Sequence, residues 1–130
     1  MIGLVYSDIL LDHFKNPRNV GELPPPAVTV EVENPACGDI LRLSVLLDNG
    51  AVSAARYKVR GCTASIAAAS ALTEWMEGKT PGDLAMLNPA AIERAVGGLI
   101  PESKHAAVLC VDGVKAFVAR VSDPRDPNRK

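Results

Sequence analysis

The sequence has no marked excess of charge of either sign. Its 130 residues hold 14 basic and 15 acidic side chains, for a formal net charge of −1, and no basic stripe of the kind that attracts a phosphate backbone. It also has no internal repeat and no run approaching the ~20 apolar residues that span a bilayer. We therefore expect neither nucleic acid nor a membrane as a partner.

Cysteine is scarce, and the three cysteines stand at positions 37, 62 and 110. An odd number does not make a disulfide framework, and the N-terminus has neither the charged start nor the long apolar run of a signal peptide. We expect a protein of the reducing cytoplasm. A chain of this length buries about two-thirds of its unfolded surface without staples, so a bound metal would serve function rather than hold the fold.

The first half of the chain predicts a short helix followed by three strands. The helix covers residues 5–15, with Ser7 as its cap and Asn16 and Pro17 as its stop. Alternating apolar residues predict strands over 27–33, 40–47 and 51–60, and Asp48-Asn49-Gly50 predicts a hairpin between the last two. A row of basic side chains in the third strand is typical of a solvated sheet face, namely Arg56, Lys58 and Arg60.

The second half predicts helices. A helical pattern runs from Cys62 to Gly78, two short helices lie near 81–86 and 89–96, and Ser103 is a candidate cap for a last helix ending near Arg120. Residues 123–130 are typical of a disordered tail. These patterns predict one α+β domain over residues 1–122, with a three-stranded antiparallel sheet and helices packed on one face.

A candidate metal site begins at Cys37-Gly38-Asp39. Residues two apart in an extended segment project from one face, so the thiol and the carboxylate can converge on one ion, and Gly38 lets the backbone bend between them. Cys62 stands at a predicted helix N-terminus, where the helix dipole favours a thiolate. The alternatives are an ordinary turn at 34–39 and a buried cysteine at 62.

Two further candidates lie on the last predicted helix. His105 falls in its first turn and can face the same cleft as Cys62, although a lone histidine is more often a surface residue. Cys110 falls near the middle of an apolar stripe. This position favours a core residue at least as much as a metal ligand. The sequence leaves both interpretations of Cys110 open.

Several ordered motifs together resemble the iron–sulfur cluster scaffolds of the IscU/NifU type, over about residues 6–121. The motifs are Tyr6-Ser7, Asp12-His13-Phe14-Lys15-Asn16-Pro17-Arg18-Asn19-Val20-Gly21, Pro35-Ala36-Cys37-Gly38-Asp39, Gly61-Cys62 with its Ala/Ser-rich helix, Thr73-Glu74-Trp75 and Gly78-Lys79. The resemblance implies an α+β fold of the IscU/SufE type and a non-enzymatic scaffold role. By resemblance, Cys37, Asp39 and Cys62 take the positions of the family's first two ligand cysteines and the aspartate between them.

The resemblance also implies a chemistry and partners. Scaffolds of this family build a labile 2Fe-2S cluster from iron and from sulfur supplied by a cysteine desulfurase, and they pass the cluster to apo-proteins. We expect Cys62 to be the candidate persulfide acceptor, because it stands at a helix terminus. The expected ligand set is Cys37, Asp39 and Cys62, completed by His105 or Cys110.

The chain departs from the family pattern in its last ligand motif. The family has a proline-valine-lysine segment followed by histidine and cysteine, and here His105 matches the histidine while Ala106 stands at the cysteine position. Cys110 comes one helical turn later, displaced about 6 Å along the axis. The pair Glu102-Ser103 also departs from the segment that a specialised Hsp70 chaperone recognises, which places that chaperone and its J-type partner in doubt.

Two alternatives to the cluster scaffold follow. Cys37, Asp39, Cys62 and either His105 or Cys110 also make a tetrahedral zinc set, as in the zinc-binding sulfur acceptors of the SufU branch, which stimulate a desulfurase. That branch carries an insertion ahead of its last cysteine, for which the spacing here leaves no room. A divergent interaction module without cluster assembly is the other alternative, and Ala106 is its main support.

Overall fold

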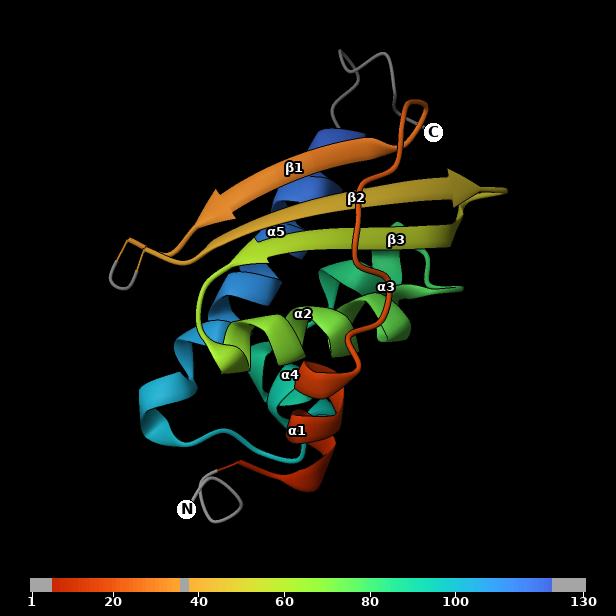
Figure 1. Ribbon diagram of the computed structural model, residues 1–130. Helices are drawn as coiled ribbons and strands as arrows, with labels where there is room; N and C mark the ends of the chain where they lie inside the picture. The colour runs from red at the N-terminus through yellow and green to blue at the C-terminus, as the bar shows by residue number, and fades with distance from the viewer. Residues whose placement is uncertain (1–5, 36–37, 123–130) are drawn as a thin grey trace.

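The computed structural model of the protein describes residues 6–35 and 38–122. A three-stranded sheet follows one helix and precedes the others (Figure 1). The elements are α1 (Asp8–Lys15), β1 (Val28–Glu33), β2 (Ile40–Asp48), β3 (Ala51–Arg60), α2 (Thr63–Met76), α3 (Pro81–Ala85), α4 (Pro89–Ala95), the 3-10 turn η2 (Pro101–Ser103) and α5 (His105–Ser122).

The sheet has the strand order β1-β2-β3, and both pairings are antiparallel. At the turn between β2 and β3, Asp48 pairs with Ala51, so the connection is Asn49-Gly50. Both connecting residues have positive φ, 54° and 81°, which is why asparagine and glycine occupy this hairpin. The predicted strands and the predicted hairpin are confirmed.

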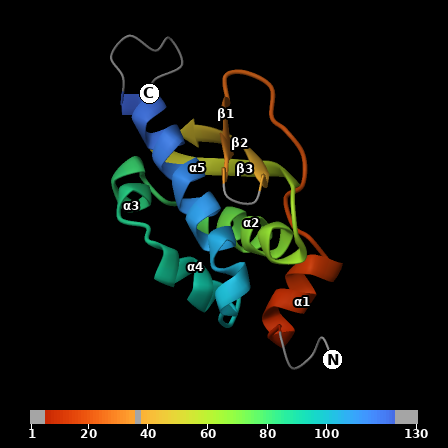
Figure 2. The same ribbon diagram turned by 90° about the vertical axis from the view of Figure 1, so that its left-hand side faces the viewer.

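The helices gather on one face of the sheet, as Figures 1 and 2 show. Helix α5 packs across β1 and β2, while α2 packs against β3. The approach of α5 is close because residue 113 is glycine: a Cβ there would lie 2.8 Å from Cδ2 of Leu41. The predicted class, α+β with helices on one sheet face, is therefore confirmed.

The other sheet face carries polar side chains, among them the exposed Arg42 and Lys58. The segment that links α1 to β1 crosses this face (Figure 1). Val20 forms a parallel bridge with Tyr57, and Glu22 pairs with Arg42 at 2.7 Å. In the predicted basic row, Lys58 and Arg60 are exposed, in agreement with a solvated face.

Helix α1 begins at Asp8, because Ser7 occupies the cap position and its hydroxyl accepts a hydrogen bond from the backbone N–H of Leu10. The cap therefore has the predicted residue, and the helix begins three residues later than the predicted range. Helix α1 is tied to α2 by a buried contact of 2.8 Å between His13 Nδ1 and Ser70 Oγ.

The start of α5 differs from its predicted start. Ser103 belongs to η2 and does not cap α5; the carbonyl of Lys104 instead accepts from the N–H of Ala107, and the helix begins at His105. The predicted tail 123–130 lies outside the described residues. Among the helices of residues 6–35 and 38–122, none is long and apolar enough to cross a membrane.

Candidate metal centre

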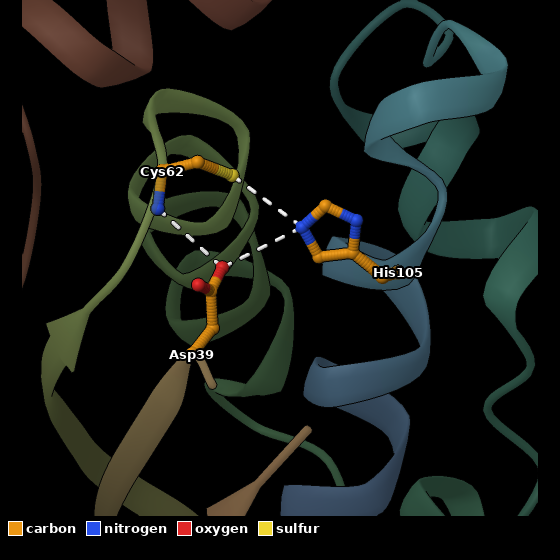
Figure 3. Close-up of side chains that lie close together, drawn as sticks. All are labelled: Asp39, Cys62 and His105. Carbon is orange, nitrogen blue, oxygen red and sulfur yellow. Dashed lines mark hydrogen bonds and ion pairs between the residues drawn. The ribbon is translucent and has the colours of Figure 1, made fainter. Parts of the chain in front are cut away.

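Three polar side chains from distant parts of the sequence meet at one edge of the sheet. Asp39 directly precedes β2, and Cys62 follows β3 by two residues. Because β2 and β3 are antiparallel, with Ile40 opposite Arg60, the start of one strand lies beside the end of the other. The first residue of α5, His105, completes the group (Figure 3).

The donor atoms of Asp39, Cys62 and His105 all lie within 4.8 Å of one another. Cys62 Sγ is 3.6 Å from His105 Nε2, and Asp39 Oδ2 is 3.5 Å from the same nitrogen. Ligands bound at about 2.0–2.3 Å to a tetrahedral ion lie about 3.3–3.8 Å from each other. The two separations measured from His105 Nε2 therefore suit one tetrahedral ion, zinc or iron.

Cys62 occupies the N-cap position of α2 with an extended backbone, φ −77° and ψ 171°. Its side chain makes no capping hydrogen bond, and the residue is exposed. The thiol is thus directed to the edge of the sheet rather than to the helix terminus behind it. This position agrees with the expected location at a helix start.

Asp39 is the buried member of the group, with 8% of its surface exposed. Its Oδ2 accepts a hydrogen bond of 2.6 Å from the Ser65 hydroxyl and a longer one of 3.4 Å from the backbone N–H of Cys62. Gly61 leaves room for the carboxylate, since a Cβ at this position would lie 2.6 Å from Asp39 Cγ. The carboxylate therefore has a fixed position between two residues of the β3–α2 connection and one of α2.

His105 faces Cys62, as the sequence led us to expect. Its side chain is half-buried, with 26% exposed, and its Nε2 is the atom directed at the sulfur and the carboxylate. Ala106, at the family's cysteine position, is fully buried. Because position 106 is alanine, it supplies no thiol next to His105.

Cys110 lies apart from this group, in the hydrophobic core. It is 1% exposed and is surrounded by the buried residues of α5 and the sheet. Burial raises the pKa of its thiol to about 12. Of the two interpretations that the sequence left open, a core residue fits this environment, and among the described residues Cys110 is not in the group whose ligand atoms can reach one ion.

Cys37 lies outside the described residues. The residue after it, Gly38, has φ of +78°, which agrees with the expected bend between the thiol and the carboxylate positions. Its backbone N–H donates to the carbonyl of Asn34 at 2.7 Å. Gly38 thus belongs to a turn that leads directly into Asp39.

Two residues of this site were not singled out as such from the sequence, Ser65 and Gly61. Both lie within three residues of Cys62, and Ser65 is a polar residue that is 2% exposed on an alanine-rich helix. A buried hydroxyl requires a hydrogen-bond partner, so a serine on an apolar helix is the sequence signal that could have indicated Ser65. The sequence could not say which partner, because Asp39 is 26 residues away.

Comparison with known proteins gives a consistent result. The model of the family described as NifU-like N terminal domain matches residues 5–124. An iron–sulfur cluster assembly scaffold protein IscU of Azotobacter vinelandii is 39% identical over 119 residues, covering 88% of this chain and 92% of its own length. The protein of that name in Escherichia coli K12 is 34% identical over 127 residues, covering 95% and 98%.

Among solved structures, an iron–sulfur cluster assembly scaffold protein for the SUF system of Fervidobacterium islandicum superposes with a TM-score of 0.71. It is 22% identical, and the match covers 88% of this chain and 96% of that one. A NifU-like N-terminal protein of Brucella abortus gives a TM-score of 0.60 at 23% identity, covering 92% and 83%. These two structures show that the fold is shared.

Proposed function

Because this chain belongs to the family of NifU-like N-terminal domains, we propose that it is a scaffold on which iron–sulfur clusters are assembled and from which they are transferred. The observation that carries the proposal is the convergence of Asp39, Cys62 and His105 within 4.8 Å at an accessible edge of the sheet. A scaffold must load and release its cargo, and an exposed edge serves both steps better than an enclosed cavity.

The ligand set that we propose is Cys37, Asp39, Cys62 and His105. It combines two thiolates with an imidazole and a carboxylate, and a hard carboxylate oxygen binds iron less tightly than a thiolate does. The cargo is a transient 2Fe-2S cluster. One weak ligand suits a protein that must give up what it has assembled.

The position of Cys62 supports a role in sulfur acceptance. Its thiolate attacks the terminal sulfur of a persulfide on a cysteine desulfurase; a new S–S bond forms at Cys62, the old one breaks, and the desulfurase cysteine leaves as a thiolate. His105, 3.6 Å from the sulfur, is placed to take the thiol proton. The proposed partners are this desulfurase and the apo-proteins that receive the cluster, in a reducing cytoplasm.

A zinc-binding sulfur acceptor is the second candidate function. The separations of 3.5 and 3.6 Å between the donor atoms favour it, since they suit a single tetrahedral ion. In this role the protein would stimulate the desulfurase by removing its persulfide sulfur, and no sulfide would accumulate on the acceptor.

Anaerobic reconstitution with ferrous iron, a cysteine desulfurase, cysteine and a thiol reductant, which reduces the persulfide sulfur to sulfide, tests the two candidates. A scaffold gains iron and acid-labile sulfide in equal amounts and transfers both to an apo-ferredoxin, and omission of the desulfurase prevents this. Retention of zinc alone, with faster desulfurase turnover and no sulfide, supports the sulfur acceptor. Neither metal at stoichiometric level, with no response of the desulfurase, contradicts both and supports an interaction module.

A further inference from the structure

The carboxylate of Asp39 is held by a second residue that is not itself in the ligand set. We propose that Ser65 is a positioning residue, whose hydroxyl fixes Asp39 in the orientation in which it binds the metal. This inference rests on the proposed ligand role of Asp39, and it assigns a function to a residue that does not touch the ion.

The hydrogen bond between Ser65 and Asp39 is short and shielded from water. Ser65 Oγ donates to Asp39 Oδ2 at 2.6 Å, within the range of a charge-assisted bond from a hydroxyl to a carboxylate. The two residues are 2% and 8% exposed. Such a bond restricts rotation of the carboxylate more than a surface bond would, because water cannot replace it.

The hydroxyl acts on the site through Asp39 rather than through Cys62. Ser65 Oγ is also 3.5 Å from Cys62 Sγ, but a hydroxyl has only one proton to donate. The ionised carboxylate at 2.6 Å is the stronger acceptor, so the proton is directed at Asp39 and the sulfur contact adds little.

Gly61 also contacts the carboxylate of Asp39. A Cβ on this residue would lie 2.6 Å from both Cγ and Oδ2 of Asp39, so the carboxylate rests on bare backbone. A side chain at position 61 would push the carboxylate off this surface. Gly61 and Ser65 therefore form one cradle, and Oδ2 within it stays 3.5 Å from His105 Nε2.

A ligand that is already oriented binds a metal more tightly than one that must first be ordered. Loss of an outer partner of a ligand typically costs about tenfold to a hundredfold in metal affinity. We expect Ser65→Ala to weaken metal binding by about tenfold or more. Gly61→Ala should weaken it through the same carboxylate while leaving the Ser65 hydroxyl in place.

The test is an anaerobic titration of the metal-free protein with Co²⁺. Binding is monitored through the absorption bands of tetrahedral cobalt and of thiolate-to-cobalt charge transfer. Ser70→Ala is the matched control: Ser70 is also a buried serine of α2, but its hydroxyl contacts His13. We expect Ser70→Ala to bind Co²⁺ with wild-type affinity. If Ser65→Ala binds Co²⁺ more weakly but keeps the thiolate-to-cobalt bands, its loss of affinity is due to the carboxylate and not to the thiolate. Thermal unfolding of each metal-free variant verifies that it is folded.

A double-mutant cycle separates positioning from a general structural effect. In an Asp39→Ala background, Ser65→Ala should cause no further loss of Co²⁺ affinity. Unchanged affinity in Ser65→Ala, or the same loss with and without Asp39, would overturn the inference while leaving the proposed function intact. If Asp39→Ala alone leaves the affinity unchanged, the proposed ligand set itself is wrong.

Discussion

Cys62 and Cys110 are the same residue type in opposite surroundings. Cys62 is exposed at the N-cap of α2 and lies 3.6 Å from a histidine. Cys110 is 1% exposed in the second turn of α5, where burial raises the pKa of its thiol to about 12. The two thiols differ because Cys62 precedes the first turn of its helix at the end of a strand, whereas Cys110 lies on the face of α5 that packs into the core.

The largest expected contrast is in thiol reactivity. A thiol with a pKa of about 12 is ionised in only about one molecule in ten thousand at about pH 8. Iodoacetamide should therefore modify Cys62 at least ~1,000-fold faster than Cys110 in the folded, metal-free protein. Peptide mass spectrometry over a time course measures the two rates separately.

Denatured protein, in which both thiols are exposed, provides the control for this contrast. There the two rates should become similar. Comparable rates in the folded protein would show that Cys110 is accessible, and its assignment to the core would then fail.

The two histidines allow a second, smaller contrast. His105 lies in the candidate site, whereas His13 is buried between α1 and α2. We expect His105→Ala to weaken Co²⁺ binding by at least about tenfold, because it removes a ligand rather than an outer partner. His13→Asn should leave the affinity unchanged, and an equal loss in both variants would remove His105 from the ligand set.

The smallest expected effect concerns the pH dependence of stability. Burial first, and then the nearby Arg18, lower the pKa of His13 below its usual 6.5, while Glu74 and Asp12 oppose the shift. The neutral imidazole is therefore favoured in the folded state. Its contribution to stability is fully present above pH 6.5 and is lost as the pH falls through the lower folded pKa.

Thermal unfolding of the metal-free protein between about pH 7.5 and 5 measures this loss. The melting temperature of the wild type should fall more over this range than that of His13→Asn, because each pKa unit between folded and unfolded states corresponds to about 1.4 kcal/mol. Parallel curves for the two proteins would show that His13 does not titrate differently on folding.

Most of the fold follows from local signals in the sequence. Alternating apolar residues, the Asn49-Gly50 turn and the cap Ser7 act over a few residues, so the pattern predicts them. The prediction of Ser103 as the cap of α5 is wrong, because Pro101 begins a 3-10 turn that includes Ser103 ahead of the helix.

The candidate site was predictable in its residues but not in its geometry. The sequence indicated Asp39, Cys62 and His105, and the antiparallel pairing of β2 with β3 explains why the first two meet. Ser65 depends on a contact between residues 26 positions apart, which no local pattern carries. Similarly, the spacing could not distinguish a displaced ligand from a core residue at Cys110, because that difference lies in which way the helix faces.

Reconstitution of Cys62→Ala and Cys110→Ala side by side tests whether Cys62, and not Cys110, holds the cluster. Each variant is incubated anaerobically with iron, desulfurase and cysteine, and bound iron and acid-labile sulfide are measured with circular dichroism as the control for folding. We expect wild-type amounts on Cys110→Ala and neither iron nor sulfide on Cys62→Ala. A folded Cys110→Ala that has lost its cluster, or a Cys62→Ala that keeps it, would show that these two roles are assigned wrongly.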